Sequence, residues 1–192
     1  MESQLGVFQR QLSQLLKDPV GLSSVGTQTA KTISQRLESA VTMTAVTPQE
    51  NPLSESLRQV ANRVNDLPRQ LQPLVNSFFD IADDLTWFQR AAVNQPDFMA
   101  GHANAEIIGP RGLAVGDGIT VGVTLMQPDL TYPDHHHPPE EIYLVLSEGL
   151  WWQQGQPWWS PDIGGYVYNP ANIVHAMQSL DKPLFAIWCF KD

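Results

Sequence analysis

The stretch HHHPPEEIYLVL, residues 135–146, decides which fold the sequence predicts. Three consecutive histidines and two glutamates stand directly before an apolar run that is typical of a β-strand. Histidine is the commonest metal ligand in proteins and changes its charge near neutral pH. The stretch therefore indicates a metal or proton-transfer site. For the histidines alone, a solvated polar loop that leads into a strand is an equal alternative.

The spacing within this stretch predicts which side chains meet. Alternate residues of an extended strand share a face, so His135 and His137 point to one side, and Glu141 and Tyr143 share a face after the two prolines. If these residues face the interior of a barrel, they converge and form a metal site with a phenol beside it. A further ligand is expected from another strand at His175, for which a hydrogen-bonded core histidine is the alternative.

The sequence pattern changes from helical to β-rich near the middle of the chain. Apolar residues recur at helical spacing in the first half, and Thr47-Pro48-Gln49-Glu50 has the residues of a helix start, so we expect three to five helices before residue 90. Residues 21–29 and the segment around Thr47 are expected to be connections between helices. From about residue 104, short β-rich runs alternate with turn residues, which predicts an antiparallel sandwich or barrel. We expect His102 to be a surface or hydrogen-bonded loop histidine.

Charge and composition exclude several classes of partner. The net charge is −9, and residues 95–192 hold 11 acidic but only 3 basic side chains. Such a surface suits neither nucleic acid nor anionic lipid, and no apolar run approaches the ~18 residues that span a bilayer. The N-terminus lacks the pattern of a secretory signal, and the single cysteine, Cys189, permits no disulfide within the chain. We therefore expect a cytoplasmic protein.

The histidine-rich stretch resembles the first motif of the cupin superfamily. That motif runs roughly G-x5-H-x-H-x3,4-E-x6-G, and this chain has His135, His137 and Glu141 at the matching spacing. Gly149 comes one residue later than usual, and the glycine at the start of the motif is missing.

The second cupin motif, roughly G-x5-P-x-G-x2-H-x3-N, has its counterpart from Gly164 to Ser179. Pro170 and His175 match, Asn172 replaces a glycine, and Ser179 replaces the final asparagine. Asparagine also tolerates a left-handed turn. The resemblance implies a mainly β fold with α: a C-terminal cupin β-barrel (double-stranded β-helix) over residues 95–192 that holds one metal, preceded by an N-terminal helical region over residues 1–94 that packs on it.

The whole chain is similar to a narrower group. The helical first half, followed by TYPDHHHPPEEIYLVLSEG (131–149) and GGYVYNPANIVHAMQS (164–179), resembles the bacterial cupin lyases that cleave dimethylsulfoniopropionate (DMSP), above all the type called DddQ. For that family the reaction is β-elimination, which gives dimethyl sulfide and acrylate. The resemblance implies a small-molecule substrate, DMSP, and a carbon–sulfur lyase.

The resemblance also implies roles for individual residues. It assigns one divalent transition metal ion, with zinc or iron first and manganese, cobalt or nickel as further options. Tyr143 matches a metal-proximal tyrosine that acts as the base, and His135 is either a fourth ligand or a proton-handling residue. The family's site positions fall on these residues: His137, Glu141, His175, Tyr143 and His135 at the metal, and Tyr143, His135 and Tyr132 as catalytic residues.

Two other functions and several roles for the helices stay open. An iron dioxygenase would use His135, His137, Glu141 and His175 as ligands, and a non-catalytic barrel would bind a small molecule. The helical half packs on the barrel, covers the pocket mouth or forms a homodimer interface. Aromatic faces that could hold an onium group by cation–π attraction are numerous: Trp151, Trp152, Trp158, Trp159, Tyr166, Tyr168 and Trp188.

Overall fold

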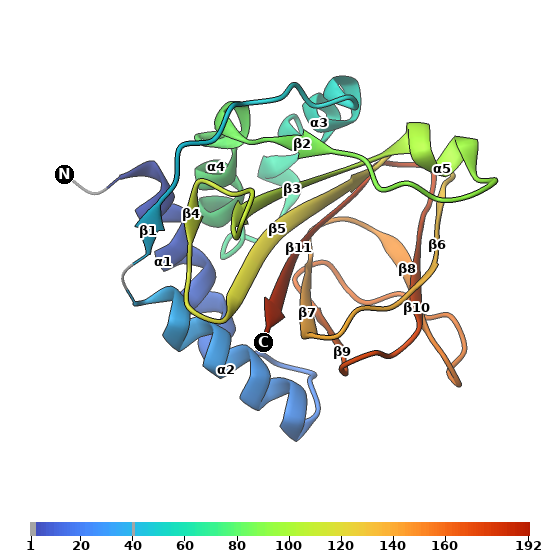
Figure 1. Cartoon of the computed structure of the whole chain (residues 1–192). Coiled ribbons are helices and arrows are strands. Elements are labelled where there is room, and N and C mark those ends of the chain that lie inside the picture. Colours follow the sequence, from blue (N-terminus) through green and yellow to red (C-terminus); the bar gives the residue numbers. More distant parts are fainter. Residues whose placement is uncertain (1–2, 40) are drawn as a thin grey trace.

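The computed structural model describes residues 3–39 and 41–192 (Figure 1). The helices are α1 (Gln4–Lys17), α2 (Ser24–Leu37), α3 (Ser54–Ala61), α4 (Gln72–Phe79) and α5 (Pro96–Gly101), with 3-10 turns η1 (Val64–Asp66) and η2 (Ala82–Asp84). The strands are β1 (Thr42–Met43), β2 (Trp87–Phe88), β3 (His102–Ile108), β4 (Ala114–Val115), β5 (Ile119–Met126), β6 (Thr131–His135), β7 (Glu140–Val145), β8 (Gly149–Gln153), β9 (Tyr166–Asn169), β10 (His175–Ser179) and β11 (Leu184–Lys191). Within the described part, α1 to α4 precede residue 90, as expected.

Two sheets form the barrel. The larger has the strand order β1-β4-β3-β5-β11-β7-β9, with β2 paired to β3, and the smaller has the order β6-β10-β8. All of these pairings are antiparallel except β3 with β4. Figure 1 shows the smaller sheet on the side of the barrel away from α1 and α2. The cupin β-barrel with a helical N-terminal part is thereby confirmed.

Strand β7 has the two faces that its alternation predicts. Tyr143 and Val145 belong to the apolar cluster inside the barrel, whereas Ile142 and Leu144 belong to the cluster under the helices. Both faces are buried because the sheet is covered on one side by helices and on the other by the smaller sheet. Glu141 therefore shares the interior face with Tyr143, as predicted.

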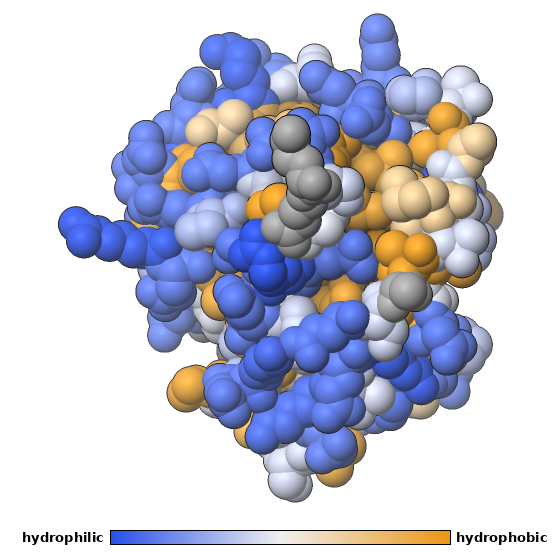
Figure 2. Space-filling view, turned by 90° about the vertical axis from the view of Figure 1, so that its left-hand side faces the viewer, coloured by the Kyte–Doolittle hydropathy of each residue, from blue (hydrophilic) through white to orange (hydrophobic). Residues whose placement is uncertain are grey.

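The helices close the outer face of the larger sheet. Helix α1 buries an apolar stripe that includes Phe8 and Leu12, and α2 buries Ile33 and contacts β7 and β11. Figure 2, which looks at this side of the molecule, shows mainly hydrophilic residues on the outside, so the apolar stripes face inward. The boundary that we placed at residue 94 stays a prediction, and β1 and β2, which precede it, pair with strands of the larger sheet.

Two local predictions were wrong. Thr47–Glu50 does not start a helix: this segment is extended, and Gln49 donates its backbone N–H to Leu85, so pairing with a distant segment outweighs the local capping pattern. Residues 21–29 are not all a connection, because the Ser23 hydroxyl accepts from the Gly26 N–H and starts α2 at Ser24. Among the described residues, no helix combines the length and the apolar content that crossing a membrane requires.

Candidate active site

Three predicted ligands meet inside the barrel. Glu141 lies on β7, His175 begins β10, and His137 lies in the loop between β6 and β7. Glu141 Oε2 lies 3.1 Å from His137 Nε2 and 3.3 Å from His175 Nε2, and one ligand atom from each residue lies within 4.8 Å of the others. Glu141 and His175 are each 1% exposed.

The backbone fixes which nitrogen of each ring faces this centre. Nδ1 lies 3.1 Å from the Pro139 carbonyl oxygen in His137 and 2.9 Å from the Ile173 carbonyl oxygen in His175. A carbonyl oxygen only accepts, so Nδ1 carries the proton and Nε2 of the neutral ring keeps a lone pair. His175 Nε2 is buried and has no hydrogen-bond partner among the described residues. Two lone pairs and a carboxylate thus converge, and this donor set fits a divalent metal ion.

Glu141 is held by residues that the sequence analysis did not identify. Asn169 Nδ2 donates to Glu141 Oε2 at 2.7 Å, and Gln153 Nε2 donates to Asn169 Oδ1 at 2.6 Å. Burial opposes ionisation of Glu141, but hydrogen bonds and positive charge from His137 and His175 would hold the pKa of this carboxyl well below its usual range when both ring nitrogens are protonated. Asn169 thus holds one carboxylate oxygen beside both rings.

The glycine that the second motif lacks is replaced without strain. Asn172 has φ 60°, the left-handed conformation that a cupin glycine would take and that asparagine tolerates. Its backbone N–H donates to the carbonyl oxygen of His137 at 2.9 Å. The turn after β9 thus anchors the loop that carries the first ligand.

His135 lies beside the cluster and is not a member of it. Its ring centroid is 4.1 Å from that of His175, and its Nδ1 lies 2.9 Å from the Pro133 carbonyl oxygen. Burial, with the neighbouring His175, lowers the pKa of His135 to about 3, so the ring is neutral at physiological pH. Whether it is a fourth ligand or handles protons stays a prediction. His136 is exposed.

Two tyrosines complete the interior wall. Tyr132 and Tyr143 are each 3% exposed. Burial and the charge of Glu141 raise the pKa of Tyr143 well above its usual value, and burial raises the pKa of Tyr132 to about 12. Both phenols are therefore protonated at neutral pH unless a metal ion binds beside them.

These groups enclose a small polar space inside the barrel. Its free volume is about 10 Å³. Of the aromatic residues proposed to hold an onium group, Trp188 lines it, whereas Tyr166 donates to the Leu15 carbonyl oxygen and Trp152 packs near Trp158. The lining is Arg90, Asn104, Thr124, Tyr132, His135, His137, Glu141, Tyr143, Trp188 and Phe190.

The Trp188 ring fits against β5 because the residue opposite it is a glycine. Trp188 of β11 pairs with Gly122 of β5, and a Cβ on Gly122 would collide with the indole ring and with the Ala105 carbonyl oxygen. Gly122 thereby lets the indole ring lie against β5 at the edge of the enclosed space.

His102 lies outside the cluster, as expected, but it is not at the surface. It is fully buried, its Nε2 accepts from the Arg90 backbone N–H at 2.7 Å, and its ring stacks on Phe98 at 3.9 Å between centroids. Burial lowers the pKa of His102, so it is a neutral structural residue.

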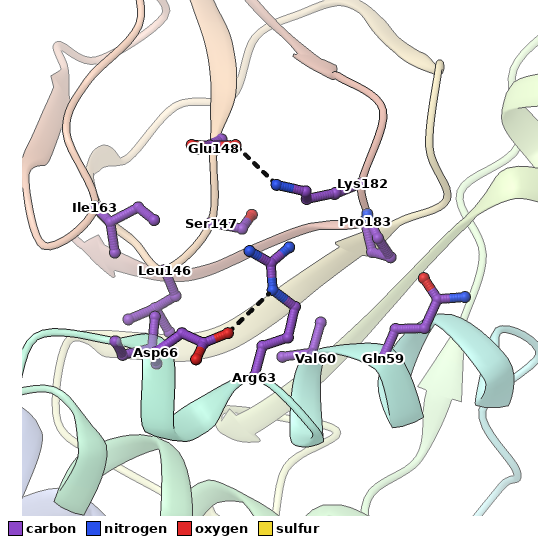
Figure 3. Close-up of a pocket in the computed structure, with 11 residues that line it drawn as sticks. Gln59, Val60, Arg63, Asp66, Leu146, Ser147, Glu148, Ile163, Lys182 and Pro183 are labelled. Atoms are coloured by element: carbon purple, nitrogen blue, oxygen red, sulfur yellow. Dashed lines mark ion pairs between the residues drawn. The ribbon is translucent and has the colours of Figure 1, made fainter.

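Another hollow, of about 90 Å³, lies between the α3–η1 segment and the end of β7 (Figure 3). Its charged side chains pair with each other: Arg63 with Asp66 at 3.6 Å and Lys182 with Glu148 at 3.6 Å. None of the cluster residues lines it, so the candidate active site is the interior space.

Comparisons with known proteins show a similarity to DMSP lyases. The sequence is 35% identical over 92 residues to the DMSP lyase DddQ of Ruegeria pomeroyi, covering 47% of this chain and 46% of that protein. It is 26% identical over 137 residues to the putative DMSP lyase DddL of Cereibacter sphaeroides, covering 70% and 56%. The chain thus spans about half the length of the curated relatives it matches.

Solved structures show the same architecture. A chain from the crystal structures of the DMSP lyases RdDddP and RnDddQII has a TM-score of 0.75 at 21% identity, over 98% of this chain and 92% of that chain, which shows the fold. DddQ from Ruegeria pomeroyi has a TM-score of 0.64 at 26% identity, over 80% and 78%. The sequence model described as dimethylsulfoniopropionate lyase matches residues 25–186, so the chain belongs to the DMSP lyase family.

Proposed function

We propose that this protein cleaves DMSP by metal-dependent β-elimination to dimethyl sulfide and acrylate, with Tyr143 as the base. The observation that carries the proposal is the cluster of His137, Glu141 and His175, whose Nε2 lone pairs and carboxylate converge beside a buried phenol. Membership of the DMSP lyase family supports the choice of substrate.

The reaction needs a stabilised carbanion. A proton α to a carboxylate is weakly acidic because its removal adds negative charge to an anionic group. A bound divalent metal ion supplies a positive charge that stabilises this carboxylate and favours the phenolate of Tyr143. Zinc or iron is the first choice and manganese, cobalt or nickel also suit these ligands, because a redox-neutral elimination needs only a Lewis acid.

Side chains of this protein take up the proton and bind the substrate. The Tyr143 phenolate takes the α proton, the electron pair forms the C=C bond, and the C–S bond breaks. Dimethyl sulfide leaves as a neutral molecule, so no general acid is required. The rings of Trp188 and Phe190 line the space and offer faces to the sulfonium group. Tyr132 and His135 border the same space and are proposed to position the substrate or handle protons.

Two variants separate the base from the ligands. Tyr143→Phe removes one hydroxyl from the interior face, so we expect turnover to be abolished while metal content stays near normal. His175→Ala removes a ligand, so we expect the metal content itself to fall. Metal analysis and headspace detection of dimethyl sulfide on the same samples check both. A Tyr143→Phe protein that keeps most of its activity would contradict the base assignment and make His135 the candidate.

The dioxygenase alternative makes a different prediction. It needs His135 as a fourth ligand, whereas the cluster in the described residues has three members. Oxygen uptake by the iron-loaded protein, measured without DMSP and with candidate small acids, would support that alternative. The lyase proposal predicts product release without oxygen consumption.

A further inference from the structure

The enclosed space contains one arginine that the proposed reaction does not yet use. Arg90 follows β2, is half-buried and lines the space. Its backbone N–H donates to His102 Nε2 at 2.7 Å, which fixes the start of its loop. No carboxylate among residues 3–39 and 41–192 pairs with its guanidinium, although the chain carries 20 acidic side chains.

The positive charge of Arg90 acts on the pKa of both tyrosines in the site. Burial dominates the raised pKa values of Tyr132 and Tyr143, and the Arg90 charge opposes that rise in both. Among the described residues that line the space, Arg90 is the only arginine or lysine. Arg90 therefore supplies the positive charge at one end of the space.

A second donor in the same lining also lacks a partner. Asn104 on β3 is 3% exposed, and its Oδ1 accepts from the Thr124 hydroxyl at 2.6 Å. That bond assigns the oxygen of the carboxamide and leaves Nδ2 as a donor. Nδ2 is buried and meets no partner at hydrogen-bond geometry in the part of the chain that the structure describes, although it lies near enough to the Tyr132 hydroxyl to lower the pKa of that phenol. A buried donor without a partner is costly, so it calls for an acceptor that arrives with a ligand.

We propose that Arg90 and Asn104 form the subsite that binds the carboxylate of the substrate. Both offer only donors toward the space, and a carboxylate offers only acceptors. The inference rests on the proposed function. It adds that the site accepts only substrates with a carboxylate and rejects those with a neutral amide in its place. The same donors stabilise the negative charge that builds on the carboxylate as the α proton leaves.

Entry of a ligand requires side chains to move, because a free volume of about 10 Å³ holds roughly one water molecule. Arg90 belongs to a loop and is half-buried, whereas Asn104 and Thr124 lie on strands and are buried. Arg90 is therefore the part of the subsite that can withdraw without breaking a strand pairing.

The test compares two probes, propionate and its neutral isostere propionamide, on the metal-loaded protein by calorimetry. Hydrogen bonds to a charged group correspond to about a 10- to 150-fold difference in affinity, so we expect the wild type to prefer propionate by at least ~10-fold. Arg90→Gln should reduce this preference by at least ~10-fold, and Arg90→Lys should restore part of it. Arg63→Gln, in the hollow of Figure 3, is the matched control and should leave the preference unchanged.

A second variant guards against misfolding. Asn104→Asp keeps an acceptor for Thr124 and replaces the free donor with a negative charge, so propionate binding should fall further than propionamide binding. Thermal melts and metal content of each variant establish that it is folded and loaded. The inference is overturned if Arg90→Gln keeps the wild-type preference, or if the folded wild type shows none.

The two proposals fail separately. If the loaded wild type releases no dimethyl sulfide from DMSP, the proposed function fails, and the preference for propionate is still measurable. If the wild type turns over DMSP and Arg90→Gln has the same KM and the same preference for propionate, the proposed function stands and the subsite is wrong.

Discussion

Replacing Asn169 with leucine tests how the metal ligands are held. Asn169 is 1% exposed, and its Nδ2 donates to Glu141 Oε2 at 2.7 Å, so the variant removes a buried, charge-assisted hydrogen bond while roughly keeping the side-chain volume. Such a bond contributes about 1.5–3 kcal/mol, which corresponds to about a 10- to 150-fold change in an equilibrium constant. Replacing a residue that orients a metal ligand typically lowers metal affinity by about 10- to 100-fold.

We therefore expect Asn169→Leu to weaken zinc binding by about 10- to 100-fold, measured by competition with a chromogenic chelator at fixed pH. Asn65→Leu, at an exposed position on η1, is the matched control and should bind zinc like the wild type. Far-UV circular dichroism shows whether the fold is kept. A folded Asn169→Leu protein with zinc affinity within twofold of the wild type would mean that Asn169 does not orient Glu141 for metal binding.

Three further predictions concern the fold around the site. Burial lowers the pKa of His102, so the folded state resists protonation of this ring. The free energy of unfolding is therefore full above the unfolded pKa of about 6.5 and falls below that pH, by at most ~1.4 kcal/mol per pH unit. Urea unfolding at pH 7.5 and 5.5 should show a smaller loss of stability in His102→Gln than in the wild type, and equal losses would exclude this role. Gly122→Ala should displace the Trp188 ring, lower stability by about 1–3 kcal/mol and shift tryptophan fluorescence, and an unchanged spectrum would contradict the packing. Leu12→Ala, a fully buried position on α1, should lower the unfolding free energy by about 2–5 kcal/mol, and a loss below ~1 kcal/mol would mean that α1 is not part of the core.

The sequence predicted those parts of the site that depend on local spacing. Strand alternation was sufficient to place Glu141 and Tyr143 on one face, because β7 is extended without a bulge and both of its faces are buried. The second motif located His175, and Asn172 proved equivalent to the missing glycine because it takes the same left-handed conformation.

The parts that were missed depend on contacts between distant segments. Arg90 and Asn104 lie 30 or more positions before the histidines, on a loop and a strand that only the barrel brings to them. Asn169 stands directly before the motif proline, which was the one available signal for it. The capping pattern at Thr47 failed for the same reason, since pairing of this segment with residues 85–87 outweighed its local helix preference.

Release of dimethyl sulfide and acrylate from DMSP shows whether the protein is a metal-dependent lyase. The protein is purified, stripped with a chelator and reloaded in separate samples with zinc, iron, manganese, cobalt or nickel. Each sample is mixed with DMSP, and dimethyl sulfide in the headspace and acrylate in solution are quantified together. We expect equal amounts of both products from a reloaded sample and none from the stripped one. No product with any of the five candidate metals, or equal release from the stripped sample, would contradict it.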